Sequence, residues 1–465
     1  MGHGHGHGHG HDDAPDLALR RWSRTVVVAV VVVSGVAALL GVALTWPDAH
    51  RVERTEGRYP YAAKGVVIVH ARLLDVRTAC TGAEAPGTTT CGDSRVRILD
   101  GRSRGRVVAI QLTPDVIASR LRPGDGVLVL DSTAAEQPAA SAGSGTGPDA
   151  AAAAAAASSP FSFYRADRGP GLIWLAVLFA LAVLLVAWRR GLMALLGLGF
   201  AGAVVVLFLI PALLGGSAPV GATLSASVLI LIVLLYATHG PSMRTSVALV
   251  GALVGLVLSV ACSWLAVVGT HLAGIGDDAS ALLVFNVRWI DVQQLVIASV
   301  VLAGLGTLND VTVTQASALW ELRAAAPDAP SRRLFVAAMR IGRDHVASSV
   351  YTLVFAYLGT ALVLLVAVQL SAGSPGDLLT SEDVAEEVVR TLVGGIALVL
   401  AMPITTAIGV LVVASAAVDP DARTPVPGIG PATSGAGGRA GGARPYGGRG
   451  SAHRRRPAPG SGASA

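Results

Sequence analysis

The residues best suited to chemistry in this chain lie between Gly304 and Leu322, at the end of a long apolar run. Polar side chains recur there every three or four residues, a spacing that places them on one face of a helix. A carboxylate within a membrane is costly unless it faces protein or water, so Asp310 is a candidate to carry a proton or a cation. The polar face comprises Thr307, Asp310, Thr314, Ser317 and Glu321, and Asn309 and Gln315 are further candidates for a transport path.

The position of Asp310 in the apolar run allows two interpretations. Gly304 and Gly306 precede it and permit a close helix approach or a local break, so they are candidate hinges of a transport site. Counted from Val292, however, Asp310 lies about 27 Å along the helix, near the far edge of the hydrocarbon core. In that case residues 311–322 would lie along the membrane as an amphipathic helix.

A second polar group opens the next apolar run, with Arg343, Asp344 and His345 in sequence. Antiparallel packing of the two helices would bring Arg343 or His345 toward Asp310 or Glu321, which allows an ion pair or a proton relay. The alternative is that these basic residues anchor their helix at the cytoplasmic surface.

About eight apolar runs, each roughly 17 to 25 residues long, must position these groups. The chain is 52% hydrophobic and 14% charged, with a mean hydropathy of +0.61, which is typical of a protein dissolved in lipid. We therefore expect an all-α polytopic membrane bundle, with a kink at Pro403 in the last helix. The runs are Thr25 to Thr45, Leu172 to Trp188, Leu192 to Leu214, Val220 to Ala237, Ser246 to Val268, Val292 to Val313, His345 to Gln369 and Thr391 to Ala416.

The charges predict how the chain is oriented. Arginines gather in alternate loops and in both terminal segments, so residues 1–24 and 420–465 are expected in the cytoplasm of a bacterial cell. The net charge of +5 does not indicate nucleic-acid binding, because the arginines flank apolar runs rather than one folded face. The expected parts are an anchor helix at 25–45, a seven-helix membrane domain at 172–416 and the region between them.

The region between the first two helices, 61–131, has short β-branched runs separated by turn residues. We expect a small all-β extracytoplasmic domain, an OB-like barrel, that acts as a structural cap or docks a protein partner. Residues 132–168, rich in Ala, Ser and Gly, are expected to be a linker. Cys80 and Cys91 would form a disulfide in this oxidising compartment, although two unpaired thiols are the alternative.

The two tails carry no folding signal. His3, His5, His7, His9 and His11 alternate with glycine and bind metal ions weakly, or belong to a tag or a low-complexity tail. The C-terminal tail, 420–465, is rich in Gly, Pro and Arg and is expected to be disordered. We find no phosphate-binding loop, zinc helix or paired nucleophile and base, so we expect no enzyme, cofactor or fixed metal site.

Two segments together resemble the YibE/F-like membrane proteins, especially their actinobacterial type. They are GTLNDVTVTQASALWEL in 304–322 and RIGRDHVASSVYTLVFAY from Arg340 to Tyr357. Family members often carry an acidic pair where this chain has Asn309 and Asp310, so Asp310 would act alone here. The resemblance implies a multi-pass permease of unspecified substrate.

Two functions follow as hypotheses. The first is a secondary transporter in the bilayer that carries a small solute or ion along the helices containing Asp310 and His345. The second is a non-transporting scaffold or regulator whose outer β-domain binds a protein partner.

Overall fold

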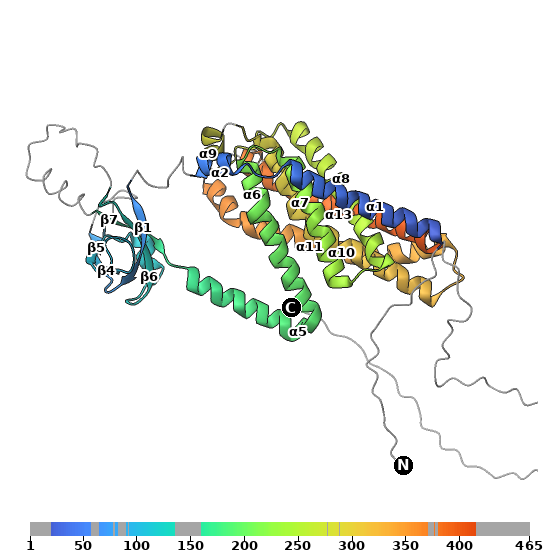
Figure 1. The fold of residues 1–465 in the computed structure, drawn as a ribbon, viewed down its shortest axis with the longest axis horizontal. Coiled ribbons are helices and arrows are strands. Elements are labelled where there is room, and N and C mark those ends of the chain that lie inside the picture. The colour runs from blue at the N-terminus through green and yellow to red at the C-terminus, as the bar shows by residue number, and fades with distance from the viewer. Residues whose placement is uncertain are drawn as a thin grey trace, which may run out of the picture. The chain divides into compact units, whose positions relative to one another are not determined.

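The computed structural model describes residues 20–56, 65–77, 80–81, 90–91, 93–134, 160–276, 278–287, 289–370, 376 and 380–414. Within these ranges the chain forms long helices and a separate β-domain (Figure 1). The histidines of the N-terminal tail, most of the predicted linker and the C-terminal tail lie outside the described residues.

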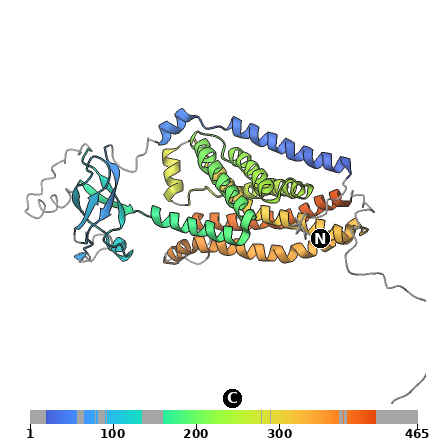
Figure 2. The same ribbon diagram turned by 60° about the horizontal axis from the view of Figure 1, so that its bottom comes forward.

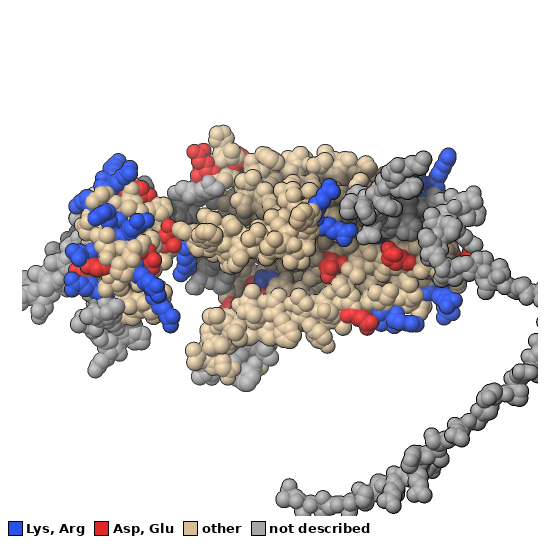
Figure 3. Space-filling view, turned by 90° about the horizontal axis from the view of Figure 1, so that it is seen from below, with Lys and Arg blue, Asp and Glu red and all other residues tan. Residues whose placement is uncertain are grey.

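Seven helical segments among the described residues are long and apolar enough to cross a membrane. The face of the helices seen in Figure 3 is mostly uncharged, whereas charged side chains crowd the β-domain. The multi-pass membrane architecture expected from hydropathy is therefore confirmed. The segments are α1 (Arg21–Leu44), α5 to α6 (Gly169–Leu214), α7 (Pro219–His239), α8 (Met243–Thr270), α10 (Val292–Ala325), α11 (Ser331–Leu370) and α13 (Glu382–Ala414).

Two of the predicted apolar runs fall on the single segment Gly169–Leu214. It contains α5 (Gly169–Val204), a π-helix η1 (Val205–Leu209) and α6 (Ile210–Leu214). The backbone of Trp188 is not helical, with φ 47° and ψ −124°, so α5 bends into two legs there (Figure 1). Gly191 follows the bend, and a Cβ there would lie 2.6 Å from the carbonyl oxygen of Val183, so the turn requires glycine.

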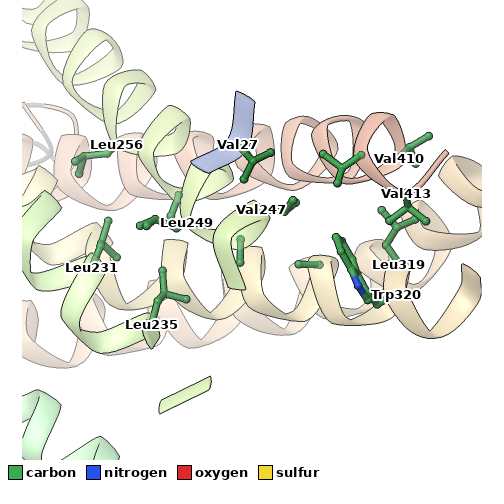
Figure 4. Close-up of a cluster of buried hydrophobic side chains, with 14 of the residues drawn as sticks. Val27, Leu231, Leu235, Val247, Leu249, Leu256, Leu319, Trp320, Val410 and Val413 are labelled. Atoms are coloured by element: carbon green, nitrogen blue, oxygen red, sulfur yellow. The ribbon is translucent and has the colours of Figure 1, made fainter. Parts of the chain in front are cut away.

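The centre of the bundle is made by α8, α10 and α13, which pack on one another where glycines leave room. A Cβ at Gly255 of α8 would lie 2.7 Å from the Leu308 side chain of α10, and one at Gly409 of α13 would lie 2.6 Å from Leu319. Such close approach is the usual way in which membrane helices gain dispersion contacts, because lipid leaves little hydrophobic drive between helices. Large apolar side chains fill the core beside these contacts, including Leu231, Leu249, Leu256, Trp320 and Val413 (Figure 4).

These contacts show which helix ends lie at the same end of the bundle. Gly409 lies near both Val247 and Leu319, so the start of α8 and the end of α10 are at one end of the bundle, which we call the basic end because it holds Arg244 and Arg323. The opposite end, which we call the acidic end, holds Asp291 and Glu382. There the Glu382 carboxylate accepts hydrogen bonds from the backbone N–H groups of Ala273 (2.6 Å) and Gly274 (2.8 Å). Two short helices lie between the long ones along the chain, α2 (Ala49–Glu56) after α1 and α9 (Asp278–Asn286) between α8 and α10.

The β-domain is a five-stranded antiparallel sheet in the order β5-β4-β1-β6-β7. Its core is made by alternate residues such as Val69, Val96 and Val129, as expected for strands with one buried face. No ladder joins β5 to β7 in the part of the chain that the structure describes, so the closed OB-like barrel stays a prediction. The elements are β1 (Val67–Leu73), β4 (Ser94–Ile98), β5 (Val107–Ile110), α3 (Pro114–Ala118), β6 (Gly126–Asp131) and β7 (Phe161–Ala166), with a separate two-stranded ladder of β2 (Cys80–Thr81) and β3 (Thr90–Cys91).

Strand β7 lies inside the stretch that was predicted to be linker, 132–168. It returns to pair with β6, with Phe161 opposite Asp131 and Phe163 opposite Val129. The boundary predicted at residue 131 is therefore wrong, because the sheet needs Phe161, which is 4% exposed, to complete its core.

Candidate functional site

The polar faces of α10 and α11 meet at Asp310 and His345. The Nε2 atom of His345 lies 3.1 Å from the Oδ2 atom of Asp310. The side chain of Asp310 is 62% exposed on the flank of the bundle, and that of His345 is 28% exposed. Of the pairings that antiparallel packing allowed, the structure contains this one, which joins a carboxylate to an imidazole.

Asp310 lies near the middle of α10, because this helix continues without interruption to Ala325. It is roughly 16 Å along the axis from Ser299 and roughly 20 Å from Arg323. Segment 311–322 packs inside the bundle, with Val311 and Leu319 fully buried. The interpretation of that segment as an amphipathic helix along the membrane is therefore wrong. The hydropathy of the run falls at Asn309, but the residues that follow remain packed in the bundle.

A buried polar contact lies about one turn from Asp310, toward the basic end. The hydroxyl of Thr406 on α13 has one proton and two acceptors within reach, the Oε1 atom of Gln315 (3.0 Å) and the carbonyl oxygen of Met402 (2.8 Å), and Gln315 and Thr406 are both 0% exposed. The Nε2 atom of Gln315 has no hydrogen-bond partner among the described residues. It lies against Gly342 of α11, where a Cβ would be 2.1 Å away. Three helices therefore meet around one amide.

The glycines predicted as hinges have a different environment. The helix α10 is continuous through Gly304 and Gly306, and a Cβ at either position would meet nothing within 4 Å among the described residues. Neither the predicted close approach nor a break is present at these two positions. The close approaches occur instead at Gly251, Gly255 and Gly342.

The proline of α13 lies beside the buried amide contact. Pro403 is inside a continuous helix, between Met402 and the two threonines Thr405 and Thr406. The threonines point in different directions: Thr405 lies against Gly251 of α8, and Thr406 against Gln315 of α10. The missing N–H of Pro403 leaves the Val399 carbonyl without its helical donor, which is where such helices deform most easily.

The other predicted residues stay apart from the Asp310–His345 contact. Thr307 donates to the carbonyl of its own helix at Gly304 (2.9 Å), and Asn309 is half-buried, with an Oδ1 atom that lacks a partner among the described residues. No hydrogen bond or ion pair in the described part of the chain joins the remaining residues to Asp310 or His345. They are the half-buried Thr314 and Ser317 and the exposed Glu321, Arg343 and Asp344.

An ion pair near the acidic end was not expected from the sequence. Arg390 donates to Glu387 (2.5 Å) one turn away on α13, and its second nitrogen lies 3.4 Å from Ser299 of α10. Both side chains are at most one quarter exposed. The i, i+3 spacing could have indicated this pair, but both residues precede the apolar run predicted from Thr391.

A cavity of about 350 Å³ opens between α11 and α13 beside this ion pair. Its walls are almost wholly apolar, apart from Tyr357, Glu387 and Thr391. None of the predicted site residues lines it.

The comparisons with known proteins agree with the helical architecture. The family model described as YibE/F-like protein matches residues 175–415, which is just over half of the chain and includes α10, α11 and α13. Neither the curated proteins nor the solved structures contain a match. The matched residues hold both halves of the Asp310–His345 contact and the buried Gln315–Thr406 contact. The chain is therefore a multi-pass membrane protein that belongs to the YibE/F-like protein family.

Proposed function

We propose that the protein is a permease or secondary transporter whose polar pathway follows the α10–α11 interface. The observation that carries the proposal is the contact between Asp310 and His345 near the middle of α10, on a flank where the carboxylate is 62% exposed. A carboxylate at that depth is costly against lipid tails, so we expect water to line this flank. Asp310 and His345 together would pick up and release a proton or hold a small cation.

The neighbouring turn supports the same pathway. Gln315 lies inside the bundle about one turn from Asp310 toward the basic end, and Gly342 lies about one turn from His345 in the same direction. The contact at Gly342 leaves no space between α10 and α11, whereas Asp310 and His345 lie at the edge of that contact. Rotation or separation of α11 would therefore change the pairing of Asp310 and the environment of the Gln315 amide together.

We further propose that the chain crosses the membrane eight times, with both termini in the cytoplasm. The segment Gly169–Leu214 is about 69 Å long, more than twice the thickness of the hydrocarbon core. Its second leg runs from the bend at Trp188 toward the acidic end and passes Gly197, where an added Cβ would lie 3.4 Å from the Leu234 side chain of α7. The bend and its neighbours Arg189 and Arg190 are thus at the basic end, as the positive-inside rule requires for a cytoplasmic turn.

This orientation places the connection to the β-domain outside the cell. Helix α1 packs antiparallel to α7, with Gly41 near Ser225 and Gly35 near Ile232, so Leu44 lies at the acidic end. Reporter domains fused to the two termini should therefore appear on the same side of the membrane. Reporters on opposite sides would contradict eight crossings.

Proton flux tests the transport proposal directly. The full chain is reconstituted into liposomes that enclose a pH-sensitive dye, and a pH gradient is imposed with the membrane potential clamped. We expect a flux above that of empty liposomes, which Asp310→Asn lowers at least tenfold. Asp328→Asn makes the same change in the exposed loop between α10 and α11 and should leave the flux unchanged. No flux under any gradient would favour the alternative, a scaffold that binds a partner through the β-domain.

A further inference from the structure

Three hydroxyl groups inside the bundle lack a hydrogen-bond partner among the described residues. They belong to Thr223 and Ser227 on α7 and to Ser259 on α8, and none of the three residues is more than 1% exposed. A buried hydroxyl without a partner costs about 1 to 3 kcal/mol, so three in one region call for a ligand.

The packing of α8 on α10 brings Ser259 to the level of Gly304, where a side chain would have open space. Gly255 of α8 lies against Leu308 of α10, and the two helices run in opposite directions. One turn toward the acidic end from this contact, Ser259 lies on the same face of α8 as Gly255 and at the level of Gly304. Gly304 is buried, yet a Cβ there would meet nothing within 4 Å.

The hydroxyls of α7 lie at the same level. The Tyr236 hydroxyl is 2.9 Å from the Ser246 hydroxyl, which joins α7 to α8 near the basic end. Thr223 and Ser259 are equally far from that contact, about 20 Å along their own helices. Ser227 lies one turn closer to it.

The apolar neighbours of these hydroxyls on α7 belong to clusters that α7 shares with α8 and α10. Val220, one turn before Thr223, packs against the apolar cluster that contains Val267 and Val300, whereas Ile230, one turn after Ser227, belongs to the large apolar cluster around Leu256. The three hydroxyls and Gly304 therefore lie where two apolar clusters of the bundle meet.

We propose that Thr223, Ser227 and Ser259 form, with the space beside Gly304, a pocket that binds water molecules inside the membrane. A hydroxyl both donates and accepts hydrogen bonds, and a buried water needs two to four such partners. None of the three side chains carries a charge, so the pocket suits water or a water-sized neutral molecule better than an ion.

The pocket would also form the extracytoplasmic half of the pathway to Asp310, a step that rests on the proposed function. Asn309 lies between one and two turns beyond Gly304, roughly 8 Å along α10, and its Oδ1 atom is the next buried polar atom that lacks a partner in the described part of the chain. It is adjacent to Asp310. Protons would reach the carboxylate from the acidic end through these groups.

The reactivity of single cysteines measures hydration at each position. Methyl methanethiosulfonate is small and uncharged and reacts only with thiolates, which form in water and not in apolar surroundings. In the full chain carrying Cys262→Ala, reconstituted in liposomes, Ser259→Cys and Ser227→Cys are compared with Leu256→Cys, a residue of α8 that is 1% exposed in the apolar cluster. Mass spectrometry follows each modified position over time.

We expect Ser259→Cys and Ser227→Cys to react at least tenfold faster than Leu256→Cys. Gly304→Leu, which fills the space, should slow Ser259→Cys to the rate of Leu256→Cys. Equal rates at all three positions, or rapid reaction that Gly304→Leu leaves unchanged, would overturn the pocket. Rapid reaction together with a proton flux that Gly304→Leu does not lower would establish the pocket and overturn its place in the pathway.

Discussion

The Nε2 atom of His345 and the Oδ2 atom of Asp310 lie 3.1 Å apart, although 35 positions separate the two residues in the sequence. The contact joins α10 to α11 near the middle of α10, with the carboxylate exposed on the flank of the bundle. The geometry of this carboxylate–imidazole contact depends on how the two helices pack, and we propose that the pair exchanges protons.

If Asp310 and His345 act as one relay, their substitutions should not be additive. Asp310→Asn and His345→Gln should each lower the proton flux at least tenfold in liposomes, and the double variant should be no slower than the more impaired single variant. Rates that fall by the product of the two single effects would show that the residues act independently.

Substitution of Gly342 should disturb the buried amide contact. In Gly342→Ala the added methyl group would lie 2.1 Å from the Nε2 atom of Gln315 and 2.8 Å from the sulfur of Met402, so we expect a loss of about 1 to 3 kcal/mol. Gly359→Ala on the same helix meets nothing within 4 Å and should leave stability equal or higher. Melting temperatures in detergent compare the two, and equal values would contradict the close packing at Gly342.

Removal of one polar partner at this contact should cost more than removal of both. Thr406→Val leaves the Gln315 amide buried without its hydroxyl partner, which should lower stability by about 1 kcal/mol. Adding Gln315→Leu should recover most of that loss, because no polar atom is then stranded. A double variant that melts lower than Thr406→Val would indicate that Gln315 is stabilised by another partner.

The β-domain should lose local stability in acid through Asp131. This carboxylate is 5% exposed and accepts hydrogen bonds from Ser103 (2.7 Å) and from the hydroxyl of Thr133 (2.6 Å). Burial raises the pKa of Asp131, but the hydrogen bonds from Thr133 and Ser103 and the charge of Arg106 outweigh it and leave the pKa below its ordinary value. The stabilisation is therefore present above the unfolded pKa, near 4, and is lost as the pH falls through the folded pKa.

Amide hydrogen exchange of 126–134 in the intact protein, corrected for its intrinsic pH dependence, measures this loss. Protection should fall below about pH 4 in the wild type. Asp131→Asn should be less protected at pH 6 and should vary less with pH. A wild-type profile that is flat down to pH 3 would mean that Asp131 contributes nothing to the sheet.

The disulfide expected between Cys80 and Cys91 stays a prediction, which the backbone register permits. In the ladder of β2 and β3 these two residues are direct partners. Opposite residues of antiparallel strands have Cα atoms about 4.5 to 5.5 Å apart, within the range of disulfides. We expect peptide mapping without reductant to show the two linked, while Cys262 in α8 takes up an alkylating reagent after denaturation. Alkylation of all three cysteines would contradict the bridge.

The amino-acid sequence by itself determined that this is a membrane protein and approximately where in the chain each long helix lies. Hydropathy is a local property, so the runs that dissolve in lipid could be identified without knowledge of the packing. The polar face around Asp310 was equally local, because 3.6 residues per turn set it. The predicted strands of the β-domain followed from alternation and turn residues in the same way.

Only the tertiary structure decided which of these groups meet. The rotation and register of each helix depend on contacts between residues far apart in the sequence, such as Gly255 with Leu308 and Gly342 with Gln315. Because of those contacts, His345 rather than Arg343 lies beside Asp310, and Gln315 is buried against Thr406. The return of β7 to the sheet has the same cause. Pairing with β6 stabilises a strand in a stretch whose composition indicated a linker.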